Sequence, residues 1–73
     1  MVEVYSKTVC PQCRMVKKFL DDKGIPYVEH NVEKDTDALE YLQQAGISHV
    51  PVTKVPNGKM IMGFNVNELR ELA

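Results

Sequence analysis

The sequence predicts one α/β domain over residues 1–73, with its elements in the order β-α-β-α-β-β-α along the chain. The four strands are expected to form one mixed sheet, with helices on both faces. Three observations predict this class. At 73 residues the chain has room for one hydrophobic core and not for two. Segments rich in strand-forming residues alternate with segments of helical periodicity, a pattern typical of α/β domains. An Asn-Gly pair between the last two short apolar runs predicts a β-hairpin.

The first half of the chain predicts a strand, a helix and a second strand. Residues 2–6 alternate in polarity and are rich in strand formers. A helix is expected over 11–23, because Pro11 suits a first helical turn and Gly24 is a good stop. Residues 25–32 predict the second strand, which a right-handed crossover would make parallel to the first.

The second helix follows an acidic segment. Asp35 or Thr36 can cap its N-terminus, and Gly46 ends it. Its inner face is predicted to be one apolar stripe: Ala38, Leu39, Leu42 and Ala45.

The last third predicts the hairpin and a short final helix. Residues 50–55 and 60–62 are the expected antiparallel strands, joined by a turn over 56–59. The final helix is expected over 66–72, with Asn65 at the capping position.

Charge and hydropathy exclude several classes of function. Nine Lys and Arg against ten Asp and Glu leave no excess of cations for a nucleic-acid backbone. No apolar run approaches the roughly 20 residues that cross a bilayer, and residues 1–5 lack the regions of a secretory signal. We therefore expect a cytoplasmic monomer that binds neither nucleic acid nor membrane.

Cys10 and Cys13 are the only two cysteines in the sequence. A small disulfide scaffold would need more of them. A structural zinc site needs about four ligands, and His30 and His49 do not have the usual paired spacing. Arg14 stands where a c-type haem site would need histidine. What remains is a redox pair in a reducing compartment, with no metal site.

The position of this pair gives each cysteine an expected role. Cys10 lies at or next to the N-cap of a helix, where free N–H groups and the helix dipole stabilise an anion. Its thiol pKa should fall below the free value of about 8.5, which would make Cys10 the nucleophile. Cys13, one turn inward, is the expected resolving thiol, and Pro11 limits the freedom of the loop. The alternative is that both are small core residues.

The chain resembles the glutaredoxin family, which has the thioredoxin fold, over essentially its whole length. The segments that carry the resemblance occur in the family's order: residues 6–13, Val50-Pro51-Val52 and Met62-Gly63-Phe64. Gln12-Cys13-Arg14-Met15 and Gly63-Phe64 look most like NrdH-redoxins, which take electrons from thioredoxin reductase and pass them to ribonucleotide reductase. Pro11 looks instead like a glutathione-dependent glutaredoxin, and Asn65-Val66-Asn67 departs from the Arg-Pro-Asp of the NrdH subgroup.

The resemblance implies a substrate site around the cysteine pair. Val50-Pro51 matches the family's cis-proline, where the Val50 backbone would pair with a substrate chain. Lys7 would meet the glycine carboxylate of glutathione and support the thiolate. Gly63, Phe64 and Asn65 would approach the same groove from the other side, and Gln12 is a candidate contact to the partner. Met62, Gly63 and Phe64 would form an apolar patch beside the thiols.

The resemblance leaves three functional readings, of which an NrdH-like protein recharged by thioredoxin reductase is favoured. The second is a glutaredoxin with glutathione as co-substrate. The third is a dimer that shares an iron–sulfur cluster or metal through its cysteine pairs, which a stiff Pro11 disfavours. In the first two readings the redox-active Cys10–Cys13 disulfide does the work without a resident cofactor. His49, where the family more often has Thr or Ala, could tune proton transfer or be a bystander, while Tyr5 is expected in the core and His30 on the surface.

Overall fold

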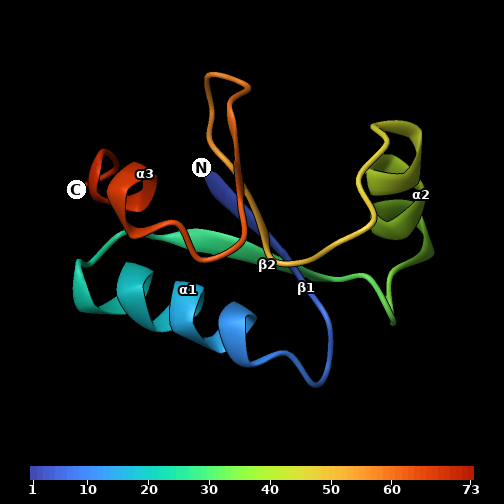
Figure 1. Cartoon of the computed structure of the whole chain (residues 1–73), viewed down its shortest axis with the longest axis horizontal. Coiled ribbons are helices and arrows are strands. Elements are labelled where there is room, and N and C mark those ends of the chain that lie inside the picture. The colour runs from blue at the N-terminus through green and yellow to red at the C-terminus, as the bar shows by residue number, and fades with distance from the viewer.

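A computed structural model describes all 73 residues, and its elements follow the predicted order (Figure 1). They are β1 (Val2–Ser6), α1 (Pro11–Asp22), β2 (Tyr27–Asn31), α2 (Thr36–Gln44), β3 (Val52–Lys54), β4 (Met60–Met62) and α3 (Val66–Arg70). The four strands form one sheet in the order β2-β1-β3-β4. β1 pairs parallel with β2 and antiparallel with β3, and β3 pairs antiparallel with β4. This is the mixed sheet that the sequence predicts.

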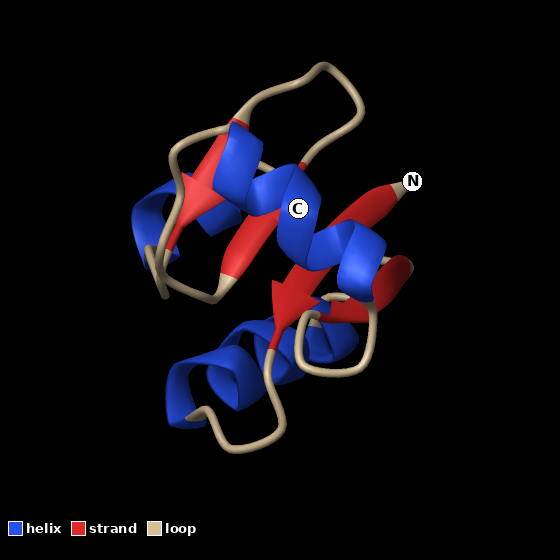
Figure 2. Ribbon diagram, turned by 90° about the vertical axis from the view of Figure 1, so that its right-hand side faces the viewer, coloured by secondary structure: helices blue, strands red, loops and turns tan.

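Helices cover both faces of the sheet, with α1 and α3 on one side and α2 on the other (Figures 1 and 2). The alternation along β1 explains this arrangement, because Val2 and Val4 point to one face and Tyr5 to the opposite face. The larger core cluster, on the α1 and α3 side, contains Val2, Val4, Val16, Leu20, Val55, Ile61 and Leu69. The smaller core cluster, on the α2 side, contains Tyr5, Ala38, Leu42 and Val52.

Two helix caps have the predicted chemistry. The Asp35 side chain accepts a hydrogen bond from the backbone N–H of Ala38 at 3.1 Å and caps α2. Asn65 does the same for α3, where its Oδ1 accepts the N–H of Glu68 at 3.2 Å. None of the three helices is long and apolar enough to cross a membrane.

β1 and β4 have the predicted bounds, whereas β2 and β3 are shorter than predicted. The strand expected over 25–32 begins at Tyr27, because the N–H of Ile25 still donates to the carbonyl of Leu20 at the end of α1. The strand expected over 50–55 begins only at Val52, after Pro51, which has no N–H to donate to the sheet. It ends before Val55, whose N–H belongs to the hairpin turn and donates to the carbonyl of Lys59.

The first and last helices are also shorter than predicted, by one and two residues. α1 ends at Asp22 rather than at residue 23. α3 ends at Arg70 rather than at residue 72, because Glu71 and Leu72 donate to carbonyls three residues earlier. Such tighter bonds are common in the last turn of a helix.

Candidate active site

Cys10 is the N-cap of α1, as the sequence predicts. Its backbone is extended, its carbonyl accepts the N–H of Arg14 at 3.2 Å, and Pro11 occupies the first helical turn. Its Sγ accepts the backbone N–H of Cys13 at 3.2 Å. A donor at this position stabilises negative charge on the sulfur, so the local structure favours a thiolate at Cys10 when the pair is reduced.

The two cysteines are joined by a disulfide, and their Cα atoms are 5.2 Å apart. Cys10 is 6% exposed and Cys13 1% exposed. An attacking partner can therefore reach the first sulfur more easily than the second. This difference agrees with the predicted order of the two thiols.

The loop that leads from β1 to Cys10 is held by the turn after β2. The backbone N–H of Thr8 donates to Oε1 of Glu33 at 2.7 Å, and Nδ2 of Asn31 donates to Oγ1 of Thr8 at 3.3 Å. The hydrogen bond from the Thr8 backbone N–H is the largest cause that lowers the pKa of Glu33 below its usual value, and the Thr8 side chain adds to it. Sequence reasoning missed Glu33, since its partner lies 25 residues away along the chain.

A second polar group links β1, β2 and α1 beneath the motif. Ser6, fully buried at the end of β1, donates from its hydroxyl to Oε2 of Glu29 at 2.6 Å. The same oxygen accepts from Nζ of Lys17 on α1 at 2.8 Å. The bond from Lys17 and then that from Ser6 lower the pKa of Glu29. This group ties the middle of α1 to the parallel strand pair.

A groove of about 430 Å³ lies beside the cysteine motif, and we call it the motif groove. Its lining is Gln12, Gly46, Ile47, Ser48, His49, Val50, Pro51, Met62 and Gly63. The Val50-Pro51 bond is cis, as the resemblance implies. No hydrogen bond within the chain engages the backbone N–H or C=O of Val50. The structure thus brings together four of the predicted substrate-binding residues: Gln12, Val50, Pro51 and Gly63.

Gly63 lies close to two other residues of the motif groove, Pro51 and Gln12. Its N–H donates to the carbonyl of Pro51 at 2.9 Å, and its φ of +66° is a conformation that side chains disfavour. A Cβ at this position would lie 3.6 Å from Oε1 of Gln12. The exposed Gln12 side chain therefore has its amide oxygen close to Gly63.

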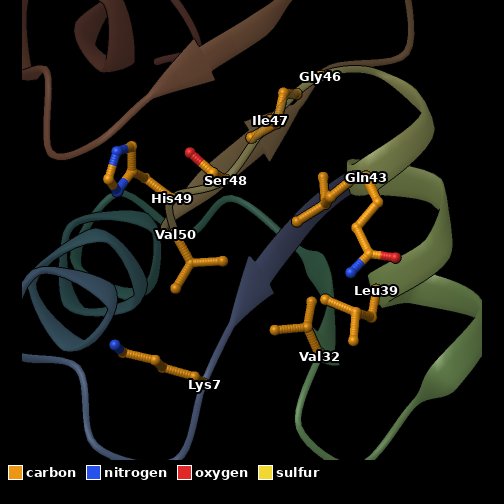
Figure 3. Close-up of a pocket in the computed structure, with 10 residues that line it drawn as sticks. Lys7, Val32, Leu39, Gln43, Gly46, Ile47, Ser48, His49 and Val50 are labelled. Atoms are coloured by element: carbon orange, nitrogen blue, oxygen red, sulfur yellow. The ribbon is translucent and has the colours of Figure 1, made fainter.

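A second groove, about 560 Å³, continues along α2, and we call it the α2 groove (Figure 3). It shares the segment Gly46–Val50 with the motif groove. Its remaining lining residues are Lys7, Val32, Leu39, Leu42 and Gln43. Lys7 and His49, both exposed, lie at this groove, and His49 also lines the motif groove.

Two predicted site residues have a different environment from the one expected. Phe64 lines neither groove, because the chain turns at Gly63 and the phenyl ring packs, half-buried, against the larger core cluster. The apolar patch predicted beside the thiols is therefore reduced to Met62, which is 52% exposed, and Gly63. Both polar atoms of the Asn65 side chain bond Glu68 in the cap of α3, so a contact of Asn65 with substrate stays a prediction.

Of the remaining side chains, Tyr5 is 5% exposed, which confirms its predicted place in the core. His30, expected at the surface, is half-buried: its ring stacks on Tyr5 and its Nε2 lies 2.9 Å from Oε1 of Glu3. No three His, Cys, Asp or Glu side chains gather closely enough to hold a metal ion.

Comparison with known proteins agrees with this geometry. The model of the family named Glutaredoxin matches residues 2–61. The glutaredoxin-like protein NrdH of Lactococcus lactis is 37% identical over the full length of both chains. An uncharacterised glutaredoxin-like protein of Clostridium pasteurianum is 36% identical over 99% of this chain and 96% of its own.

Solved structures agree as well. A thioredoxin-like protein that is 31% identical superposes over the full length of both chains with a TM-score of 0.90. The Escherichia coli NrdH-redoxin superposes with a TM-score of 0.91 over 99% of this chain and 93% of its own, and its 24% identity makes this a likeness of fold. With its thioredoxin-like fold and its Cys10–Cys13 disulfide at a helix start, the chain belongs to the glutaredoxin family of thiol–disulfide oxidoreductases.

Proposed function

We propose that the protein is an NrdH-like redoxin that reduces protein disulfides or mixed disulfides, with Cys10 as the nucleophile and Cys13 as the resolving thiol. The observation that carries this proposal is the position of Cys10 at the start of α1. Cys10 is the more exposed of the two residues, and its Sγ accepts the Cys13 N–H at 3.2 Å. Both features are required of an attacking thiolate.

The reaction transfers two electrons in two exchanges. The Cys10 thiolate attacks one sulfur of the substrate disulfide, a mixed disulfide forms, and the other substrate sulfur leaves as a thiolate. The Cys13 thiolate then attacks the Cys10 sulfur and releases the second substrate thiolate. The protein is left with the Cys10–Cys13 disulfide, and the short separation of the two residues favours this closure.

For the electron donor we propose thioredoxin reductase, with ribonucleotide reductase as one protein substrate. The full-length similarity to an NrdH protein supports this choice. The Escherichia coli NrdH-redoxin, which shares the fold, has a thioredoxin-like activity profile. The grooves give a physical reason, since Lys7 is the only Lys or Arg in their linings, whereas glutathione carries two carboxylates.

The setting we propose is the cytoplasm, because each cycle needs a reductant to return the disulfide to two thiols. We propose a monomer without a bound cluster, since attack from Cys10 needs only one chain. Iron content and colour of the purified protein would test the cluster-bound alternative. A dimer in which two chains bind one iron–sulfur cluster would contradict the proposed monomer.

A coupled assay with NADPH tests the donor. The oxidised protein is recycled once with thioredoxin reductase and once with glutathione plus glutathione reductase, at equal protein concentration, with insulin as the disulfide substrate. We expect faster NADPH oxidation with thioredoxin reductase. Efficient turnover by glutathione with none from thioredoxin reductase would establish the glutathione-dependent alternative, which Pro11 and Lys7 favour.

A further inference from the structure

The α2 groove extends the reactive surface away from the disulfide. Because both grooves are lined by Gly46–Val50, they adjoin along this segment, with Gln12 of the cysteine motif in one lining and Leu39 of α2 in the other. Gln12 of the cysteine motif lines the motif groove, so a substrate segment bound there lies beside the motif. Whatever chain follows that segment can therefore enter the α2 groove without leaving the protein surface.

The chemistry of the α2 groove favours an apolar occupant. Half of its ten lining residues are aliphatic: Val32, Leu39, Leu42, Ile47 and Val50. Figure 3 shows Val32 and Leu39 on one side of this space and Val50 with Lys7 on the other. The inner stripe predicted for α2 is correct for Ala38 and Leu42 and wrong for Ala45, which is exposed, and for Leu39, which is 38% exposed. Part of the Leu39 side chain is therefore open to a ligand. Burying apolar area there gains roughly 25 cal/mol per Å².

An extended polypeptide would bind at Val50, which lines both grooves. The N–H and C=O of Val50 have no partner within the chain, so an extended segment can pair with them. In such a segment every second side chain points to the same face, about 6.5–7 Å apart. A substrate paired with Val50 and holding its cysteine in the motif groove would therefore present the side chain two residues away to the α2 groove.

From this we infer that the α2 groove is a subsite for a large aliphatic side chain two residues from the reactive cysteine of a polypeptide substrate. The inference rests on the proposed function, since it assumes attack by Cys10. It adds a sequence preference that the cysteine motif alone does not provide. Lys7, which is exposed, is the only Lys or Arg among the residues that line this subsite.

A peptide series tests the subsite. The Cys13→Ser variant is mixed with peptides whose single cysteine is a disulfide of nitrothiobenzoate and that carry Leu, Ala or Glu two residues before or after it. The Cys10 thiolate attacks the peptide sulfur, the Cys10–peptide disulfide forms, and coloured nitrothiobenzoate leaves with the electron pair. We expect a Leu peptide to react about five- to tenfold faster than its Ala counterpart.

Two further substitutions in the same background locate the effect. Leu39→Gln should bring the Leu-to-Ala rate ratio to about two or less, because it removes apolar area from the groove wall. Val28→Gln is the matched control, since Val28 is 43% exposed and lines neither groove. Its ratio should equal that of the parent.

The outcomes separate the subsite from the function on which it rests. Equal, rapid release from Leu and Ala peptides would overturn the subsite alone, as would an unchanged ratio in Leu39→Gln. Faster release from the Glu peptide than from the Leu peptide would identify a carboxylate site instead. No release from any peptide would overturn the proposed nucleophile and the subsite together.

Discussion

Replacing Thr53 by valine should stabilise the protein. Thr53 is fully buried in β3, and its hydroxyl oxygen has no hydrogen-bond partner. Its cross-strand neighbours, Val4 and Ile61, belong to the larger core cluster, so the hydroxyl lies among aliphatic groups. Valine keeps the branched shape that suits a strand and removes the unpaired polar group.

The magnitude follows from the cost of burying an unpaired polar group. A buried hydroxyl without a partner costs about 1–3 kcal/mol, and a methyl group in its place gains apolar burial. We expect the free energy of unfolding of Thr53→Val to rise by about 1 kcal/mol. For a chain of this length that corresponds to a melting temperature higher by roughly 4–8 °C.

Urea unfolding of the disulfide form measures this difference, with the same denaturant slope expected for both proteins. Val52→Thr is the matched reverse change: Val52 is the neighbouring residue, equally buried, on the opposite face. It should lower the free energy of unfolding by about 1–3 kcal/mol. A stability of Thr53→Val below that of the parent would refute the argument and mean that the hydroxyl has a partner.

Three further outcomes are expected. Cys13→Ser should accumulate a mixed disulfide on Cys10, visible by mass spectrometry, whereas Cys10→Ser should trap no partner; the reverse result would exchange their roles. The pKa of Glu29 is lowered from its usual 4.5, so its contribution to stability is present above that value and lost as the pH falls through the lower folded pKa. Glu29→Gln should therefore flatten the loss of stability below about pH 4.5 in acid titrations, and an unchanged acid slope would contradict this. Because Phe64 packs against the core and lines neither groove, Phe64→Ala should lower the free energy of unfolding by about 2 kcal/mol, and a selective loss of the reductase-linked rate at full stability would refute that placement.

The order of elements could be predicted from sequence because each one carries a local signal. Pro11 marks the start of α1, Asp35 caps α2, and Asn57-Gly58 forms the turn between β3 and β4. The redox pair could be predicted for the same reason, since its three-residue spacing and its helix-start position are both local. The ends of β2 and β3 could not, because they depend on which backbone groups find partners across the sheet.

The polar contacts that hold the motif in place had no local signal. Ser6 and Glu29 lie 23 residues apart, and Thr8 and Glu33 lie 25 residues apart. Each pair meets because β1 and β2 run parallel and side by side, which brings Ser6 close to Glu29 and the loop after β1 close to the turn after β2. Phe64 is the opposite case: the resemblance suggests a contact in the groove, whereas after Gly63 the half-buried ring packs against the larger core cluster.

The choice of electron donor depends on these surroundings more than on the cysteine pair, because thiol–disulfide exchange at a helix start suits either reductant. Glutathione would need polar partners for two carboxylates and one ammonium group. In the structure Lys7 is exposed at one end, while the Asn65 amide at the other is already bonded to Glu68. Met62 and Leu39 instead expose apolar area along the two grooves, and such area gains free energy only against an apolar partner. The balance of these terms supports a protein as the preferred reductant and a polypeptide as the preferred substrate.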